Sequence, residues 1–174
     1  MAQVFIKELL TADNNPSLLA SVKSDDKLQN GMVVALGDRE DLSTYKVGKV
    51  ADVGADSLYI VNAPVIIEIE GIGRVEGLND PTMFEIPAKR PARAFKPMRG
   101  DTFFLSTTGI TGSPTVGEYA VPVVGAYTFG ASGTIPADIG LALKIESAKT
   151  VRVGSGSNLK SVTGFMVRVV TALN

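Results

Sequence analysis

The sequence predicts a mainly β protein, a compact β-sandwich or barrel-like domain with a few short helical turns. Three observations lead to this fold class. Short apolar runs recur along the chain, several of them alternate with polar residues, and Gly, Pro, Asn or Asp separates them. Short strands at such spacing are typical of sandwiches and barrels. An apolar content of 45% in 174 residues is enough for a hydrophobic core.

The predicted strands follow one another through most of the chain. Those of the first half span residues 32–36, 45–50, 57–61 and 65–70. Those of the second half span residues 102–106, 118–124, 126–129, 141–145, 151–153 and 164–172. In the last of them Phe165, Val167 and Val169 share one face, because side chains alternate between the two faces of a strand. This alternation indicates a strand with one buried face.

Helical signals are confined to two short segments. Asn15 is a capping residue followed by Pro16, and Asp80 precedes Pro81 in the same way, so each segment is compatible with one or two helical turns. The first 24 residues are weakly patterned, which indicates an N-terminal arm or peripheral segment. We expect residues 25–174 to form a single β-rich domain.

The composition argues against catalysis. The chain contains no His and no Cys, so it lacks the usual neutral-pH acid–base group, thiol nucleophiles, disulfides and the common zinc ligands. Seventeen basic residues balance 18 acidic ones, which argues against a general affinity for nucleic acid or acidic membranes. We expect no enzymatic activity, no cofactor and no metal site.

Neither a targeting segment nor a membrane span is predicted. Residues 1–7 lack the basic start and apolar run of a secretory signal. Residues 119–137 are uncharged but contain several Gly and Pro residues, which suit a lipid-buried helix poorly. We therefore expect assembly in a cytoplasm.

Three motifs that suggest ligand chemistry have simpler interpretations. Residues 71–77 (GIGRVEG) are one residue too long for a dinucleotide loop and precede Pro81, so a β-turn between strands is favoured. Glu68 and Glu70 share one face of a predicted strand, which indicates its solvated side rather than a catalytic pair. The acidic cluster at residues 38–41 lacks the spacing of a calcium loop and indicates a solvated turn.

Residues 89–99 form a basic segment with five positive charges and no acid. One interpretation is an exposed edge strand or connector whose prolines block further pairing. The other is a patch that docks onto an acidic protein surface, with nucleic acid disfavoured by the balanced net charge. The tripeptide at 99–101 (RGD) is explained by ordinary turn chemistry. The candidate contact residues here are Lys89, Arg90, Arg93, Lys96 and Arg99.

The segment from residue 102 to 143 carries only two charges, Glu118 and Asp138. About a quarter of the residues in an average domain are charged. Buried strands explain the lack of charge over most of these residues. Two uncharged loops, residues 107–115 and 130–136, remain and should be exposed, so we expect them to contact a shell or sister subunits. The candidate contact residues in them are Thr108, Ile110, Thr111, Ser132 and Thr134.

Several segments, taken in order, carry a resemblance to a known class of protein. They are residues 28–34 (LQNGMVV), 58–64 (LYIVNAP), 93–95 (RAF) and 99–106 (RGDTFFLS). This layout resembles that of the head decoration, or cement, proteins of tailed bacteriophages. The resemblance implies a structural virion protein that binds the outer surface of a capsid and stabilises it. It implies the major capsid protein as partner and a homo-oligomer, with a trimer favoured over a dimer.

Two other classes of protein stay open. A tail-tube or fibre subunit has a similar composition, but it self-assembles into rings or rods without a shell. A carbohydrate-binding module normally exposes Trp or Tyr platforms, and this chain has no Trp and four Tyr. Both are alternatives to the decoration protein.

Overall fold

The computed structural model confirms a mainly β protein, and of the residues that it describes 48% lie in strands and 6% in helical turns. It describes residues 3–55, 57–65, 67–69, 73–75, 80–154 and 159–172. The strands are β1 (Phe5–Leu9), β2 (Leu19–Lys23), β3 (Val33–Arg39), β4 (Thr44–Gly48), β5 (Leu58–Val61), β6 (Ile67–Ile69), β7 (Gly73–Val75), β8 (Ala92–Phe95), β9 (Thr102–Ser106), β10 (Ile110–Thr111), β11 (Tyr119–Pro122), β12 (Phe129–Ser132), β13 (Leu141–Val153) and β14 (Lys160–Ala172). The short 3-10 turns are η1 (Thr11–Asp13), η2 (Pro16–Leu18) and η3 (Thr107–Gly109).

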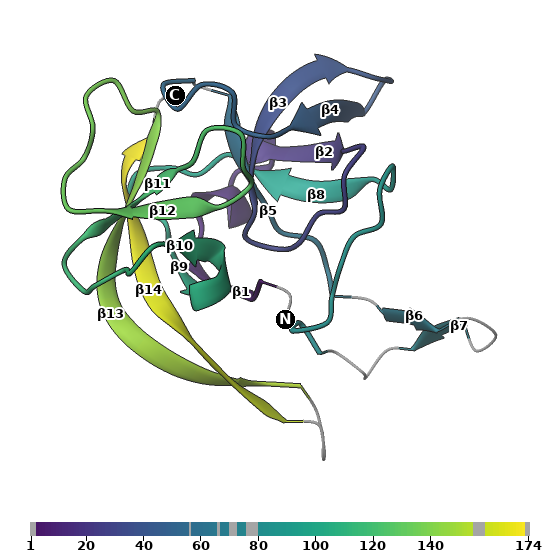
Figure 1. Cartoon of the computed structure of the whole chain (residues 1–174). Coiled ribbons are helices and arrows are strands. Elements are labelled where there is room, and N and C mark those ends of the chain that lie inside the picture. Colours follow the sequence, from purple (N-terminus) through teal and green to yellow (C-terminus); the bar gives the residue numbers. More distant parts are fainter. Residues whose placement is uncertain are drawn as a thin grey trace.

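The larger sheet has seven strands in the order β1-β9-β14-β13-β11-β12-β10 (Figure 1). Neighbouring strands in this sheet are antiparallel, except for β10 and β12, which are parallel. The long hairpin β13–β14 runs from the pair Leu141 and Ala172 to the pair Val153 and Lys160. The two strands predicted at residues 141–145 and 151–153 are therefore one strand, and a register shift between Ile145 and Ser147 interrupts its alternation.

The second sheet is a closed five-stranded barrel in the order β2-β4-β3-β5-β8. Only β2 and β4 are parallel in it. Its interior is filled by small branched and apolar side chains, among them Val22, Val34, Val47, Val61 and Ala94. The barrel-like prediction is confirmed for this part of the chain.

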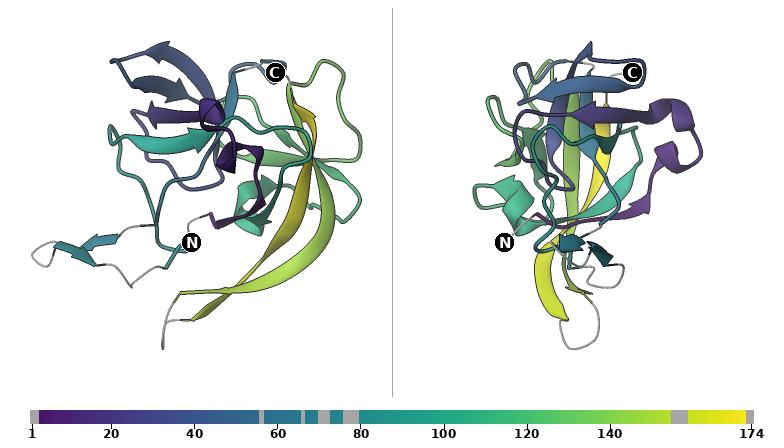
Figure 2. Two further views of the ribbon diagram at one scale, coloured as in Figure 1. Left: turned by 180° about the vertical axis from the view of Figure 1, so that it is seen from behind. Right: turned by 90° about the vertical axis from the view of Figure 1, so that its right-hand side faces the viewer.

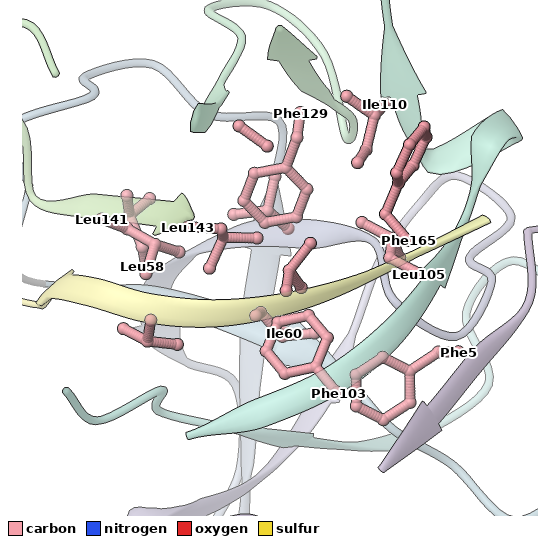
Figure 3. Packing of buried hydrophobic residues seen from close by; sticks show 14 of the residues in the cluster. Phe5, Leu58, Ile60, Phe103, Leu105, Ile110, Phe129, Leu141, Leu143 and Phe165 are labelled. Carbon is pink, nitrogen blue, oxygen red and sulfur yellow. The ribbon is translucent and has the colours of Figure 1, made fainter. Parts of the chain in front are cut away.

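The barrel and the seven-stranded sheet share one hydrophobic core (Figure 3). Phe103 of the sheet has its ring centroid 5.0 Å from that of Phe5 and 6.4 Å from that of Phe95 in the barrel. Ile60 of the barrel and Leu105 of the sheet join the same cluster, and both are fully buried. Burial of each such side chain contributes about 1.5–3 kcal/mol. The two sheets are therefore held together by apolar packing.

Within residues 1–24, for which the sequence predicts an N-terminal arm or peripheral segment, the described residues 3–24 contribute one strand to each sheet. β1 pairs with β9 at one edge of the large sheet, and β2 is a wall of the barrel. Val4 and Leu10 are buried. These strands pair with segments far along the chain, which local patterning does not reveal. The helical turn at Pro16–Leu18 is confirmed, and Asn15 caps it by accepting a hydrogen bond from the backbone N–H of Ser17.

Two further predicted elements differ from the structure. The strand expected at residues 126–129 starts only at Phe129. Residues 123–128 form a loop whose backbone makes hydrogen bonds with β3 and with the segment after β4. The backbone N–H of Val33 donates to the carbonyl of Tyr127, and that of Gly125 donates to the carbonyl of Val50. After Asp80 the chain forms a turn rather than a helix, closed by the N–H of Thr82 donating to the Asp80 carboxylate.

Strands β6 and β7 form a separate two-stranded sheet, which stands away from the body in Figure 1 and in the left-hand view of Figure 2. Residues 73–75 of the glycine-rich motif are thus a strand rather than part of a turn. The rest of that motif, residues 71–72 and 76–77, lies outside the described residues, as does Glu70. Glu68 lies in β6. The sequence also predicts a turn or loop at residues 154–158 (GSGSN), of which residues 155–158 lie outside the described residues.

The ion pair between Lys160 and Asp80 ties the start of β14 to the segment that follows β7. The Lys160 Nζ lies 2.6 Å from the Asp80 carboxylate and 3.3 Å from the hydroxyl of Thr82. Burial alone raises the pKa of Asp80, but the hydrogen bond from Lys160, those from Thr82 and the lysine charge outweigh it and lower the pKa below its ordinary value of 3.8. The ionised form of Asp80 is therefore favoured by folding.

We expect Asp80→Asn to destabilise the protein at neutral pH, with a difference from the wild type that shrinks in acid. A carboxyl group with a lowered pKa stabilises the folded state above its ordinary pKa, and this contribution is lost as the pH falls through the lowered value. Thermal unfolding of both proteins from neutral pH to about pH 2 measures the effect. A difference that stays constant over this range contradicts the role given to the ion pair.

Candidate contact surface

The described residues offer no obvious chemical centre. No group of three or more acidic residues in this part of the chain lies close enough to hold a metal ion. No helix among them is long and apolar enough to cross a membrane. The acidic cluster is exposed, as predicted, with Asp38 in β3 and Asp41 in the turn that follows it. Asp41 accepts hydrogen bonds from the N–H groups of Ser43 and Thr44, and these lower the pKa of its carboxyl group.

The basic segment lies along β8 and its two flanks. β8 pairs with β2 on one side and β5 on the other, so the interpretation as an edge strand was wrong. Its prolines, Pro91 and Pro97, flank the strand rather than interrupt it, which leaves the ladder intact. Four of the five cationic side chains are exposed and Lys96 is half-buried. The N–H of Lys89 donates to the carbonyl of Ser24.

The tripeptide at residues 99–101 is a structural turn. Asp101 is only 1% exposed, and its carboxylate accepts hydrogen bonds from the N–H and hydroxyl of Thr11 and from the N–H of Met98. Gly100 has a φ of +101°, which favours glycine. The turn interpretation is confirmed, and the carboxylate is turned away from any external receptor.

The structure brings the two uncharged loops together. β10, from the first loop, pairs in parallel with β12, from the second, at the edge of the large sheet opposite β1. The hydroxyl of Thr111 donates to the carbonyl of Phe129, which fixes the two segments against each other. Strands β10 and β12, about 20 residues apart in sequence, thus lie side by side at this end of the sheet.

The candidate residues of these loops differ in exposure. Thr108, Thr111 and Thr134 are exposed, and Ser132 is half-buried with its hydroxyl donating to the carbonyl of Thr134. Ile110 is only 3% exposed and packs in the shared core, so it is not available to a partner. The prediction for Ile110 was wrong because the parallel pairing with Phe129 turns it inward.

Apolar side chains reinforce the uncharged character of this end of the sheet. Val116 is 54% exposed and Ile135 is 38% exposed, each in a loop that joins β11 or β12. The acid between the loops, Glu118, is half-buried and accepts a hydrogen bond from the N–H of Thr115. We call the exposed parts of residues 107–117 and 132–137 the uncharged loop surface.

A groove that the sequence did not indicate lies on the outer wall of the barrel. Its volume is about 530 Å³, and it lies between β2, β8 and the segment at residues 84–87. Apolar side chains predominate, including Leu19, Phe84, Ile86 and Pro91, and Arg90 and Arg93 from the basic segment also line it. Its lining comes from residues 19–21, 63–64, 84–87 and 90–93, so no local motif marks it.

Glu85, the acidic residue that lines the groove, already has hydrogen-bond partners. Hydrogen bonds from Gln29 and Lys27 hold the pKa of Glu85 below its ordinary value. Arg93, by contrast, is exposed and has no ion pair within the part of the chain that the structure describes. The groove therefore presents an unmatched positive charge beside an apolar floor.

None of the four tyrosines forms an open aromatic platform. All four are half-buried. Arg39 lies over the ring of Tyr45 at 5.0 Å, Lys144 over Tyr119 at 5.7 Å and Lys49 over Tyr127 at 5.9 Å. Burial also raises the pKa of Tyr127, whose hydroxyl donates to Asp26.

The comparisons with known proteins give no match. No family model, no curated protein and no solved structure is similar enough to this chain to be matched.

Proposed function

We propose that this chain is a structural protein of a tailed bacteriophage particle that binds the outer surface of the capsid and stabilises it. The major capsid protein is its partner, and it acts as a homo-oligomer without cofactor or catalysis. The observation that carries this proposal is the uncharged loop surface, which two separate loops form through the pairing of β10 and β12. Charged residues are depleted at the core of protein interfaces, and the exposed apolar side chains of Val116 and Ile135 on this surface favour contact with a partner.

Two features favour this function over a carbohydrate-binding module. The tyrosine rings, which a sugar needs as flat platforms, are half-buried and three have a cation over one face. The lining of the barrel groove is apolar rather than rich in the amides and carboxylates that bind sugar hydroxyls. Both features suit a protein partner better.

A tail-tube or fibre subunit is the remaining alternative. It has the same need for wide contacts, but it forms rings or rods by itself. Sedimentation of the purified protein alone, followed by cosedimentation with empty capsids from the same genome, separates the two functions. A decoration protein stays a small oligomer and pellets with the capsids, whereas long assemblies in the absence of capsids favour the alternative.

We expect the double variant Thr111→Glu and Thr134→Glu to lose at least about tenfold in capsid affinity, because burial of unpaired charge in an interface is costly. The matched control is Thr111→Ser with Thr134→Ser, which keeps a hydroxyl at position 111 that can donate a hydrogen bond to the carbonyl of Phe129. Cosedimentation across a concentration series measures the affinity. Equal binding of both double variants removes the uncharged loop surface from the interface.

Salt dependence distinguishes this surface from the basic segment. If Lys96 and Arg99 carry the contact with the capsid, binding weakens steeply as salt rises, because exposed charges are screened. Contact through the uncharged loop surface is much less sensitive to salt.

A further inference from the structure

Asn30 and Gly31 form the only Asn-Gly pair in the sequence. In an unfolded chain such a pair is chemically labile. The backbone nitrogen of the glycine loses its proton and attacks Cγ of the asparagine side chain, a five-membered succinimide ring closes and ammonia leaves. Water then opens the ring to aspartate or isoaspartate. Glycine favours the attack because it has no side chain to hinder it.

The fold nevertheless requires both residues of this pair. Gly31 has a φ of +86°, and a Cβ on it would lie 2.7 Å from side-chain atoms of Gln3 and Leu105, so glycine is required in this turn. The Asn30 side chain accepts a hydrogen bond from the N–H of Ala63 at 2.7 Å and donates one to the carbonyl of Ala63 at 2.8 Å. These two bonds tie the turn before β3 to the segment that follows β5.

The same contacts oppose the reaction in the folded protein. The N–H of Gly31 donates to the carbonyl of Val61 at 2.8 Å, so the nitrogen that would attack is already engaged. The amide that it would attack is held by its two hydrogen bonds to Ala63. Asn30 is only 6% exposed, which limits the access of hydroxide and water to the reacting atoms. Deamidation therefore requires this part of the chain to open.

The products of the reaction do not fit the native site. An aspartate at position 30 has two accepting oxygens and no donor at neutral pH, so one oxygen faces the carbonyl of Ala63 and a negative charge is buried against it. An isoaspartate lengthens the backbone by one atom directly before Gly31, where Gln3 and Leu105 leave no space. Each product therefore opposes refolding.

We propose that Asn30 is a conditional modification site. Folding keeps its amide intact, whereas a chain that stays unfolded is deamidated there and can no longer regain a stable native state. Unfolding thus becomes irreversible with time through a hydrolysis that consumes water and releases ammonia. The inference does not depend on capsid binding.

Peptide mapping by mass spectrometry tests the proposal. Wild-type protein is held at mildly alkaline pH, either in native buffer or in guanidinium chloride, and the conversion of Asn30 is followed with time. We expect conversion to be at least about tenfold slower in native buffer, because reaction from the folded state requires local opening. Asn14, which is exposed and precedes Asn15, is the reference within the chain. In denaturant it should react more slowly than Asn30, because its neighbour is not glycine.

The consequence for folding is measured on the same samples. The fraction that regains the native circular dichroism spectrum on dilution should fall in step with the conversion of Asn30. Asn30→Asp is the aspartate product made directly, and it should unfold at a lower denaturant concentration than the wild type or fail to fold. Asn14→Asp makes the same change on an exposed residue and should behave like the wild type.

Three results overturn the proposal. The first is equal conversion of Asn30 in native buffer and in denaturant. The second is a wild type that loses the ability to refold while Asn30 is still intact, since another reaction then makes unfolding irreversible. The third is an Asn30→Asp variant as stable as Asn14→Asp.

Discussion

Replacement of Phe103 by alanine is expected to destabilise the whole protein by about 3–5 kcal/mol, the usual cost of a large aromatic deletion in a core. Phe103 is fully buried and packs against Phe5 of β1 and Phe95 of β8. No polar group competes for this space, so the cavity cannot be filled favourably by water. For a chain of this size the melting temperature should fall by roughly 6–20 °C.

The same variant shows whether the barrel and the large sheet unfold together. Because Phe103 connects them, hydrogen exchange should speed up in β5 of the barrel and in β14 of the sheet alike. Phe103→Leu, which leaves a smaller cavity, should lose less stability, and Leu42→Ala on the exposed turn should lose almost none. Two separate unfolding transitions, only one of them shifted, contradict a shared core.

The sequence predicted the elements of the fold better than their partners. Asn30-Gly31 is a typical turn dipeptide before the strand predicted at residues 32–36, and it is a turn in the structure, with Gly31 at a φ of +86°. The alternation of Phe165, Val167 and Val169 is confirmed as well, since all three are buried. Local periodicity reports which face of a strand is buried, but it does not report which strand lies beside it. The pairing of β1 with β9 therefore had no local signal.

For the candidate contact surface too, the sequence indicated the segments but not their neighbours. The two uncharged loops were identified from their composition, yet only the parallel pairing of β10 with β12 places them on one surface. The basic segment was identified from its charges, yet only Arg90 and Arg93 of its five cations line the groove. Lys89, Lys96 and Arg99 lie outside it. The apolar walls of that groove come from residues 19–21 and 84–87, which have no unusual sequence pattern. Composition finds surfaces within one segment and misses those built from several.

Asp101 holds together three segments at the start of β9. Its carboxylate accepts hydrogen bonds from the N–H of Thr11 at 2.7 Å and from the N–H of Met98 at 2.9 Å. Its own carbonyl accepts from the N–H of Val169, and the N–H of Gly100 donates to the carbonyl of Val169. Removal of the carboxylate takes this partner from the N–H groups of Thr11 and Met98, and a hydrogen bond to a charged group contributes about 1.5–3 kcal/mol.

Asp101→Ala is therefore expected to lower the free energy of unfolding by about 3–5 kcal/mol. Asp101→Asn should lie between this variant and the wild type, because its amide keeps one accepting oxygen but cannot accept at the other position. Asp13→Ala is the matched control: it removes an exposed carboxylate 2.9 Å from Lys7, and such surface pairs contribute less than about 1 kcal/mol. Denaturant unfolding measures all three. A loss for Asp101→Ala no larger than that for Asp13→Ala would mean that water replaces the hydrogen bonds of the Asp101 carboxylate at no net cost.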